Sequence, residues 1–150
     1  MKNIFFIVAV VISASLTQKV FAADTHGEKV ARNILESFRR DFILTSEASW
    51  NKIGDAFVVS FKQQGISYMA YYTGDGLLNS ISNNIEEDQL PEAVTAQILA
   101  RYENAKIIRV LKVRSLSDGI FYIIPIYSGS AQKIIKAYPS GNIETIRAAR

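Results

Sequence analysis

Apolar residues recur with two different periods along the chain, and the alternation of these periods predicts its elements. In residues 90–102 the apolar positions lie three or four residues apart, which is the spacing of one side of an α-helix. Pro91 suits the first position of such a helix, because its missing N–H would be unpaired there. Subtracting 64 from the positions of Val94, Ile98, Leu99 and Tyr102 leads to Val30, Ile34, Leu35 and Phe38, so the pattern predicts two helices of the same kind.

After each predicted helix the period changes to two, and turn residues such as Gly54, Gly65 and Gly76 separate short apolar runs. These runs predict four strands after the first helix, at 48–53, 56–62, 66–72 and 77–81. Four more follow the second helix, at 105–113, 120–127, 132–138 and 142–146. The same subtraction leads from Phe121 to Phe57 and, within one position, from Gly141 to Gly76, which extends the similarity over the whole unit.

We therefore predict an α+β fold made of a tandem repeat of two α-β4 units, residues 23–84 and 85–150, in one globular domain over residues 23–150. Pro125 interrupts the strand predicted at 120–127. Because proline has no N–H to give to a neighbouring strand, it predicts an edge position or a bulge there.

Residues 1–22 have the features of a secretory signal peptide. Lys2 precedes the apolar segment 4–12, and the small residues at Val20 and Ala22 suit cleavage after Ala22. The apolar segment is shorter than the roughly 20 residues of a spanning helix. We therefore expect a periplasmic or secreted protein without a membrane anchor after cleavage, and an uncleaved anchor is the weaker alternative. The mature chain would begin at Ala23 and is long enough for one hydrophobic core.

Composition excludes several kinds of chemistry. The chain has no cysteine, and its one histidine, His26, falls where Thr25 and Glu28 are predicted to cap the first helix. Without the signal peptide the net charge is +1, from 15 basic and 14 acidic residues, so we predict no nucleic-acid binding. The chain has no Gly-x-Ser-x-Gly motif and no phosphate-binding loop, and we predict that it is not an enzyme. Hydrolysis by dispersed carboxylates stays open as a third alternative.

Several short motifs occur together with the signal peptide. They are Val30-x-x-x-Ile34-Leu35-x-x-Phe38, the single Trp50, the turn Tyr-Tyr-Thr-Gly-Asp-Gly-Leu-Leu at 71–78, and Leu90-Pro91-x-x-Val94. In their order and spacing, the chain resembles the PepSY-like, β-lactamase-inhibitor-like periplasmic proteins of Bacteroidetes-type bacteria over essentially all of its mature length. The sequence departs from that family at Ser140-Gly141, where Asp-Gly is usual, and at Pro125.

The resemblance implies a fold and a general role. The two α-β4 units would be arranged as in β-lactamase inhibitory protein, with both helices packed on one face of a continuous antiparallel sheet. Members of the family are small periplasmic or secreted proteins, most without an assigned activity, and some are described as calcium-regulated.

Two acidic segments are weak candidates for a metal site. Asp75 lies in an Asp-Gly turn that a tight hairpin explains, and it would offer a single carboxylate. Glu86, Glu87 and Asp88 lack the spaced ligands and central glycine of a calcium loop, and they are better explained by the negative charge that a helix N-terminus favours. We predict no cofactor, with calcium as the alternative.

Adjacent apolar or aromatic residues at 69–70, 71–72, 122–123 and 134–135 place apolar side chains on both faces of the predicted sheet. Helices on one side cover only one face, and tyrosine is enriched at protein contacts. The leading hypothesis is a non-catalytic periplasmic module that binds a protein partner through its open face, with enzyme inhibition as its most specific form. The residues predicted for this contact are Trp50, Tyr68, Tyr71, Tyr72, Tyr122 and Tyr127.

The alternative function is a calcium-responsive or small-ligand-responsive periplasmic protein. The second face could also be covered by a further layer, a dimer or solvent. Neither the partner nor the oligomeric state follows from the sequence.

Overall fold

The computed structural model describes residues 30–149. They form helices α2 (Arg32–Asp41) and α3 (Glu92–Arg101), the 3-10 helix η1 (Glu87–Gln89) and a nine-stranded sheet. The first half of the sheet contains β1 (Thr45–Ile53), β2 (Ala56–Gln63), β3 (Ile66–Tyr72) and β4 (Leu78–Ile85). The second half contains β5 (Lys106–Ile107), β6 (Val110–Ser115), β7 (Gly119–Ser128), β8 (Ala131–Ala137) and β9 (Ile143–Ala149).

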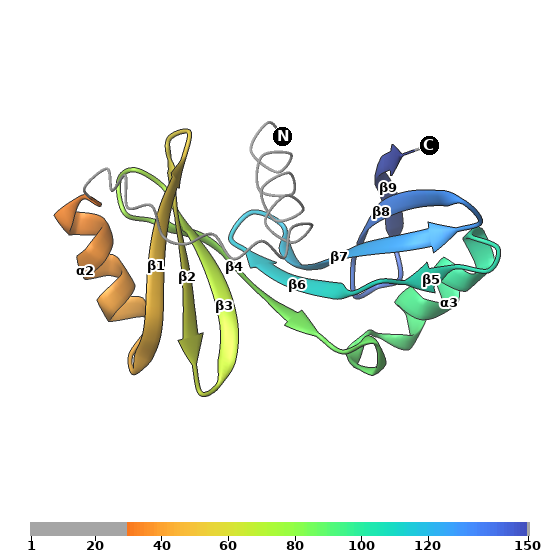
Figure 1. Cartoon of the computed structure of the whole chain (residues 1–150), viewed down its shortest axis with the longest axis horizontal. Coiled ribbons are helices and arrows are strands. Elements are labelled where there is room, and N and C mark those ends of the chain that lie inside the picture. The colour runs from red at the N-terminus through yellow and green to blue at the C-terminus, as the bar shows by residue number, and fades with distance from the viewer. Residues whose placement is uncertain (1–29, 150) are drawn as a thin grey trace.

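All strand pairs are antiparallel, and the sheet continues through both halves in the order β1-β2-β3-β4-β6-β7-β8-β9. β4 and β6 join the halves, with Ser80 opposite Ser115 and Ile85 opposite Val110. Figure 1 shows that the sheet is bent between the halves and that α2 and α3 lie on the outer side of the bend. The predicted α+β class and the continuous antiparallel sheet are confirmed.

Both helices pack on the same face of the sheet. Ile34 of α2 belongs to a buried cluster with residues of β2 and β3, and Ile98 of α3 belongs to a cluster with residues of β7 and β8. On β4, Ile81 packs against the first cluster and Ile85 against the second. Residues four positions apart in a strand point to the same side. One face, which we call the outer face, therefore carries both helices.

The prediction that residues of the two halves correspond at a constant offset of 64 positions is wrong. The offset between α2 and α3 is 60 (92 minus 32), whereas the offset between β3 and β8 is 65 (131 minus 66). Phe57 and Phe121 therefore lie on opposite faces, because Phe57 packs in the α2 cluster and Phe121 does not pack with either helix. The offset grows before the second strand of each half, where the second half has β5, a short gap and β6 in place of β1.

The strand predicted at 105–113 is divided, because Ile108 and Arg109 separate β5 from β6. The break lies opposite Pro125, whose carbonyl accepts a hydrogen bond from the Ile108 N–H with an N···O distance of 2.9 Å. In an antiparallel strand, the N–H and C=O of one residue point toward the same neighbouring strand. The side of Pro125 that lacks an N–H donor therefore faces the gap between β5 and β6. The expected edge position is wrong, because β7 lies between β6 and β8. The irregularity occurs in the neighbouring strand instead.

The start of α2 differs from the prediction. Its N-cap is Ala31, which has extended backbone angles, so Thr25 does not cap this helix. Thr25, His26, Glu28 and the predicted signal peptide at 1–22 lie outside the described residues.

The connection to α3 also differs in detail. β4 continues to Ile85, and Glu86 then serves as the N-cap of η1, with its N–H donating to Gln89 Oε1 at 3.0 Å. Pro91 is the N-cap of α3 rather than its first helical residue. Within residues 30–149, neither helix has the length and apolar character needed to cross a membrane.

Candidate functional site

The aromatic residues predicted to bind a partner lie on two different faces of the sheet. Trp50, Tyr68 and Tyr72 pack in the α2 cluster, and Tyr122 packs in the α3 cluster. All four pack on the helix side of the sheet, Tyr72 and Tyr122 as buried residues and Trp50 and Tyr68 as half-buried ones, which corrects the prediction of one tyrosine-bearing open face. Tyr71 and Tyr127 point to the opposite face, which we call the inner face because it lines the inside of the bend.

Packing around Phe38 explains why Trp50 and Tyr72 lie on the outer face. The ring centre of Phe38 is 5.3 Å from that of Trp50 and 6.5 Å from that of Tyr72, both in edge-to-face arrangements. The Tyr72 hydroxyl also donates to Asp41 Oδ2 at 3.0 Å. Burial, and then the hydrogen bond to Asp41, raise the pKa of Tyr72 above its ordinary value. Tyr72 therefore ties β3 to the last turn of α2, which is a structural role.

Two apolar clusters occupy the inner face, and neither contains a residue of α2 or α3. Leu111 of β6 packs against both clusters and so joins them across the two halves. Their buried members are Val58, Tyr71, Val113, Phe121, Ile123 and Ile134. Their half-buried members are Ile53, Met69, Leu111, Tyr138 and Ile146.

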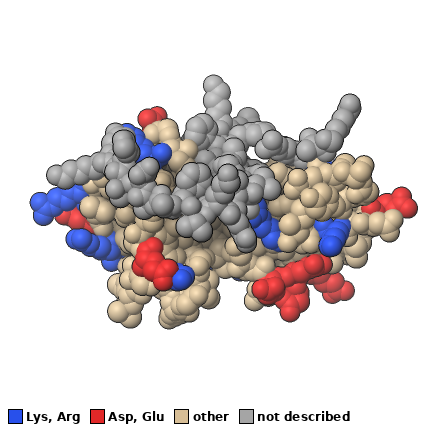
Figure 2. All heavy atoms as spheres, in the orientation of Figure 1, with Lys and Arg blue, Asp and Glu red and all other residues tan. Residues whose placement is uncertain are grey.

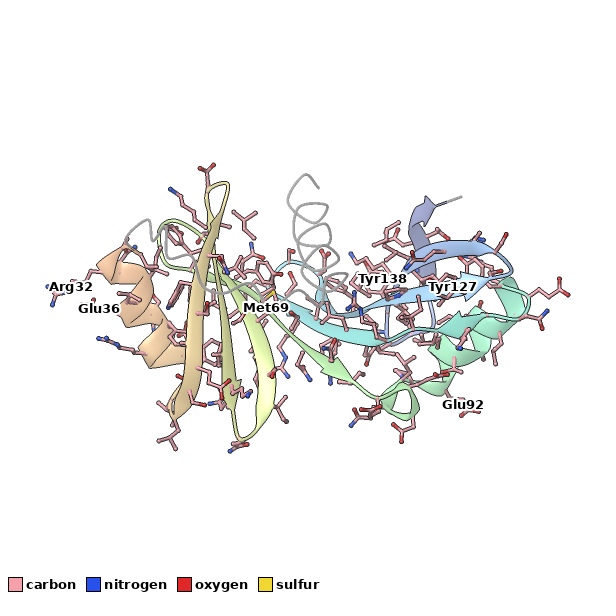
Figure 3. All side chains as sticks on the ribbon, in the orientation of Figure 1. Arg32, Glu36, Met69, Glu92, Tyr127 and Tyr138 are labelled. Atoms are coloured by element: carbon pink, nitrogen blue, oxygen red, sulfur yellow. The ribbon has the colours of Figure 1, made fainter. Side chains whose placement is uncertain are left out.

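The half-buried residues are the accessible part of the inner face. Figure 3 shows Met69 of the first half and Tyr138 of the second half on the inner side of the bend, with Tyr127 farther out along β7. Tyr71 is 3 % exposed and Tyr127 is 45 % exposed. The Tyr71 hydroxyl lies 3.0 Å from the Met69 sulfur. The sequence prediction missed Met69 and Tyr138. Their neighbours Ala70 and Ala137 pack under the helices. Because successive residues of a strand point to opposite faces, this identifies Met69 and Tyr138 as residues of the inner face.

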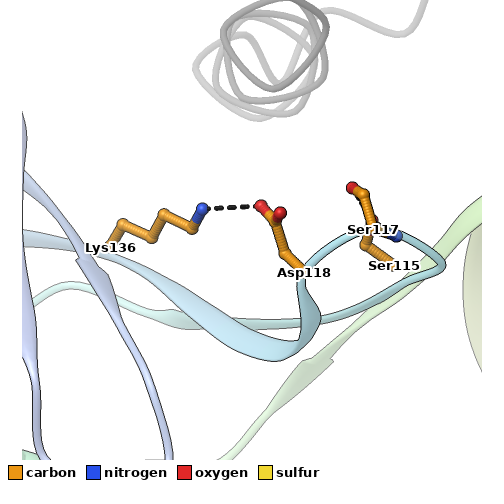
Figure 4. A network of polar contacts seen from close by, with 4 residues as sticks. All are labelled: Ser115, Ser117, Asp118 and Lys136. Atoms are coloured by element: carbon orange, nitrogen blue, oxygen red, sulfur yellow. Dashed lines mark hydrogen bonds and ion pairs between the residues drawn. The ribbon is translucent and has the colours of Figure 1, made fainter. Parts of the chain in front are cut away.

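An ion pair lies beside the second cluster. Lys136 of β8 is 3 % exposed, and its Nζ is 2.9 Å from Asp118 Oδ2 (Figure 4). The same Nζ lies 4.4 Å from the ring centre of Phe121 and 5.0 Å from that of Tyr138. Burial alone lowers the pKa of Lys136, but hydrogen bonds to Tyr138 and Asp118 outweigh burial and raise it. Lys136 is therefore held in its charged form.

Serine side chains lie along the junction of the two halves. Ser80, Ser82 and Ser115 are all buried, and Ser115 Oγ lies 3.1 Å from Ser117 Oγ (Figure 4). Among the described residues, Ser80 Oγ has no hydrogen-bond partner. Side-chain hydrogen bonds of this region join Lys136 to Asp118, Ser115 to Ser117, and Ser82 to the Met69 carbonyl, so these side chains make structural polar contacts.

The candidate metal residues do not come together. Asp75 precedes β4 and Glu86 follows it, and eight residues of strand span roughly 25 Å. A hydrogen bond from Thr73 holds the pKa of Asp75 below its ordinary value, which fits a turn that is already satisfied. Figure 2 shows acidic side chains gathered over η1 and the start of α3. Within residues 30–149, no three His, Cys, Asp or Glu side chains are arranged to hold a metal ion.

The architecture is the BLIP-like fold, that of β-lactamase inhibitory protein, and it is shared with solved structures from Bacteroides. A BLIP-like protein of Bacteroides fragilis is 12 % identical with a TM-score of 0.70, and the match covers 82 % of this chain and 91 % of that one. A DUF2874 family protein of Bacteroides uniformis is 16 % identical with a TM-score of 0.71, covering 81 % and 89 %. A protein of Bacteroides eggerthii, provisionally named periplasmic, is 15 % identical with a TM-score of 0.70, covering 81 % and 88 %.

At these identities the likeness establishes the fold alone. No protein-family model matches the chain, and no curated protein matches it in sequence.

Proposed function

We propose that this protein is an exported, non-catalytic binding module that contacts a protein partner through the inner face of its sheet. The observation that carries the proposal is the joining of two apolar clusters by Leu111 into one surface that neither described helix covers. An apolar surface of this kind on a soluble domain is typical of protein contact. The half-buried residues Ile53, Met69, Leu111, Tyr138 and Ile146 are the contact residues, in place of the aromatic set inferred from the sequence.

One buried polar group lies beneath the proposed contact surface. The Ser80 hydroxyl lies on the inner face, opposite Tyr71 and Ser115 in the neighbouring strands. Ser80 is 2 % exposed, so its hydroxyl, which has no partner among the described residues, lies beneath the contact surface and is not itself a contact group. Inhibition of a secreted or periplasmic enzyme is the most specific form of the proposal, and the BLIP-like fold supports it only by analogy.

Export and internal repetition belong to the same proposal. The predicted signal peptide at 1–22 and the provisional name of the Bacteroides eggerthii neighbour both favour the periplasm. Two tandem α-β4 units of PepSY-like type account for the matching order of helix and strands in the two halves. Joining such units through β4 and β6 doubles the width of the inner face.

Capture from periplasmic extract with the immobilised mature protein tests the contact. We compare wild type with Leu111→Lys, which places a charge between the two clusters, and with the matched control Leu99→Lys on the exposed side of α3, where Leu99 is 63 % exposed. A partner retained by wild type and Leu99→Lys but lost with Leu111→Lys supports the proposal. Equal retention by all three proteins contradicts it. Far-UV circular dichroism of each variant establishes that its fold is intact.

The calcium alternative rests on Glu86, Glu87 and Asp88 alone, because Asp75 lies at the other end of β4. Calorimetric titration with millimolar calcium tests it, together with the melting temperature with and without the ion. Absence of both heat and a thermal shift rules the alternative out.

A further inference from the structure

The connection between α2 and β1 presents apolar side chains where the fold does not require them. Ile43 is 69 % exposed and Leu44 is 91 % exposed. Ile66 of β3 is 47 % exposed and pairs with Gln63, which also pairs with Thr45 of β1. This register places Ile43, Leu44 and Ile66 at the same end of the sheet, and we call these three residues the apolar tip.

Leu44 also has an unfavourable backbone conformation. Its φ is +57°, in the left-handed region that a leucine side chain disfavours. Its side chain is almost fully exposed, so no packing within the described residues offsets that cost. The residue therefore destabilises the fold through its backbone, and its exposed side chain contributes no burial that would offset this cost.

The second half contains a matched position. Asn104 follows the end of α3 as Leu44 follows the end of α2, three residues after the last helical residue in each case, and its φ is +51°. Asparagine tolerates this conformation. The residue before it is the exposed, charged Glu103, where the first half has Ile43. The turn geometry therefore accepts Glu-Asn, and the Ile-Leu pair is not needed to form it.

Two hydrogen bonds satisfy part of the backbone of the tip. Gln63 Nε2 donates to the Ile43 carbonyl at 2.8 Å, and the Phe42 N–H donates to the Phe38 carbonyl at 2.9 Å. A carbonyl that already accepts a hydrogen bond costs little to remove from water. These bonds restrain the backbone of the tip, and a restrained segment loses less entropy when it binds.

The charges beside the tip indicate what kind of surface this is. Arg40 pairs with Asp41 at 3.2 Å, and Lys62 pairs with Glu47 at 2.8 Å. With the exposed Arg39 of the same helical turn, the charges beside the tip sum to +1, from Arg39, Arg40 and Lys62 against Asp41 and Glu47. Binding of a loop to an anionic bilayer relies instead on a cluster of basic residues. We infer that the apolar tip is a second contact surface, separate from the inner face, that inserts Ile43 and Leu44 into an apolar pocket of a protein partner.

Photocrosslinking from Ser46 tests this inference without altering the tip. A benzophenone amino acid replaces Ser46, an exposed residue next to the tip, in the full chain expressed in its native cells. The comparison chain carries Ile43→Glu and Leu44→Asn as well, which copies the Glu103-Asn104 pair. We expect a protein adduct from the first chain that is at least tenfold weaker from the second. Excess wild-type protein should suppress it, and excess double variant should not. A denaturant midpoint for the double variant at or above that of wild type excludes misfolding as the cause.

Four results overturn the inference: no protein adduct, an adduct with the mass of two copies of this chain, adducts of equal strength from both chains, or binding to phosphatidylglycerol vesicles that the double variant abolishes. Leu111→Lys in the same assay separates the two surfaces. An adduct that forms with Leu111→Lys but is lost with Ile43→Glu and Leu44→Asn supports the tip as a contact surface separate from the inner face. An adduct that is lost with Leu111→Lys but forms with Ile43→Glu and Leu44→Asn refutes the tip as a contact surface and leaves the proposed function supported.

Discussion

Replacement of Leu44 by asparagine should stabilise the protein. The φ of +57° costs an ordinary L-residue about 1–2 kcal/mol, and asparagine avoids part of that cost by local hydrogen bonding. Because Leu44 is 91 % exposed, the substitution removes little native packing. We therefore expect the free energy of unfolding to rise by about 1 kcal/mol. The reciprocal change, Asn104→Leu at a φ of +51°, should lower it by a similar amount.

Urea denaturation followed by circular dichroism measures both effects. With a slope of about 1–3 kcal/mol per molar for a small domain, the Leu44→Asn midpoint should rise by roughly 0.3–1 M. Leu116→Asn is the control. Leu116 is 70 % exposed, but it is not one of the described residues with a positive φ, so the urea midpoint of this variant should not rise. A lower midpoint for Leu44→Asn would mean that the leucine makes a stabilising contact, and the reasoning about strain would be refuted.

Two further substitutions probe the packing of the helices on the outer face. The raised pKa of the buried Tyr72 phenol means that its neutral form stabilises the fold below pH about 10 and that this contribution is lost as the pH rises further. Tyr72→Phe also removes the bond to Asp41 and should lower the free energy of unfolding by about 1 kcal/mol at pH 7. Urea titrations between pH 9 and 11 should show a smaller alkaline loss of stability for this variant than for wild type. Gly141→Ala places a Cβ 3.0 Å from that of Ala93 at a φ of +89°. It should lower the melting temperature more than Gly65→Ala, where φ is also positive but the space is open. Equal changes in melting temperature would count against tight packing of α3 on this turn.

Strand positions followed closely from the sequence because turn glycines mark their ends. The strand predicted at 66–72 has the bounds of β3, and that at 56–62 is one residue shorter than β2. The divided strand at Ile108 and Arg109 could not be predicted, because the cause is Pro125 in the neighbouring strand. Register across strands is a property of the pair, and a single strand's sequence does not contain it.

The candidate site was harder to predict than the fold for a related reason. Tyr71 and Tyr72 are both aromatic, so alternation alone does not say which of them packs against a helix. The answer depends on Phe38 and Trp50, which surround the Tyr72 ring. A constant offset between the halves also misplaced Phe121, because the offset is larger for the later strands than for the helices.

The central claim is that the inner face, joined across both halves by Leu111, is the surface that binds a partner. The most direct measurement is the affinity of a purified captured protein for wild type, Leu111→Lys and Leu99→Lys by calorimetry. The account predicts that Leu111→Lys weakens binding at least tenfold, about 1.4 kcal/mol, and that Leu99→Lys binds like wild type. Equal affinities for all three, with both variants folded, would contradict it.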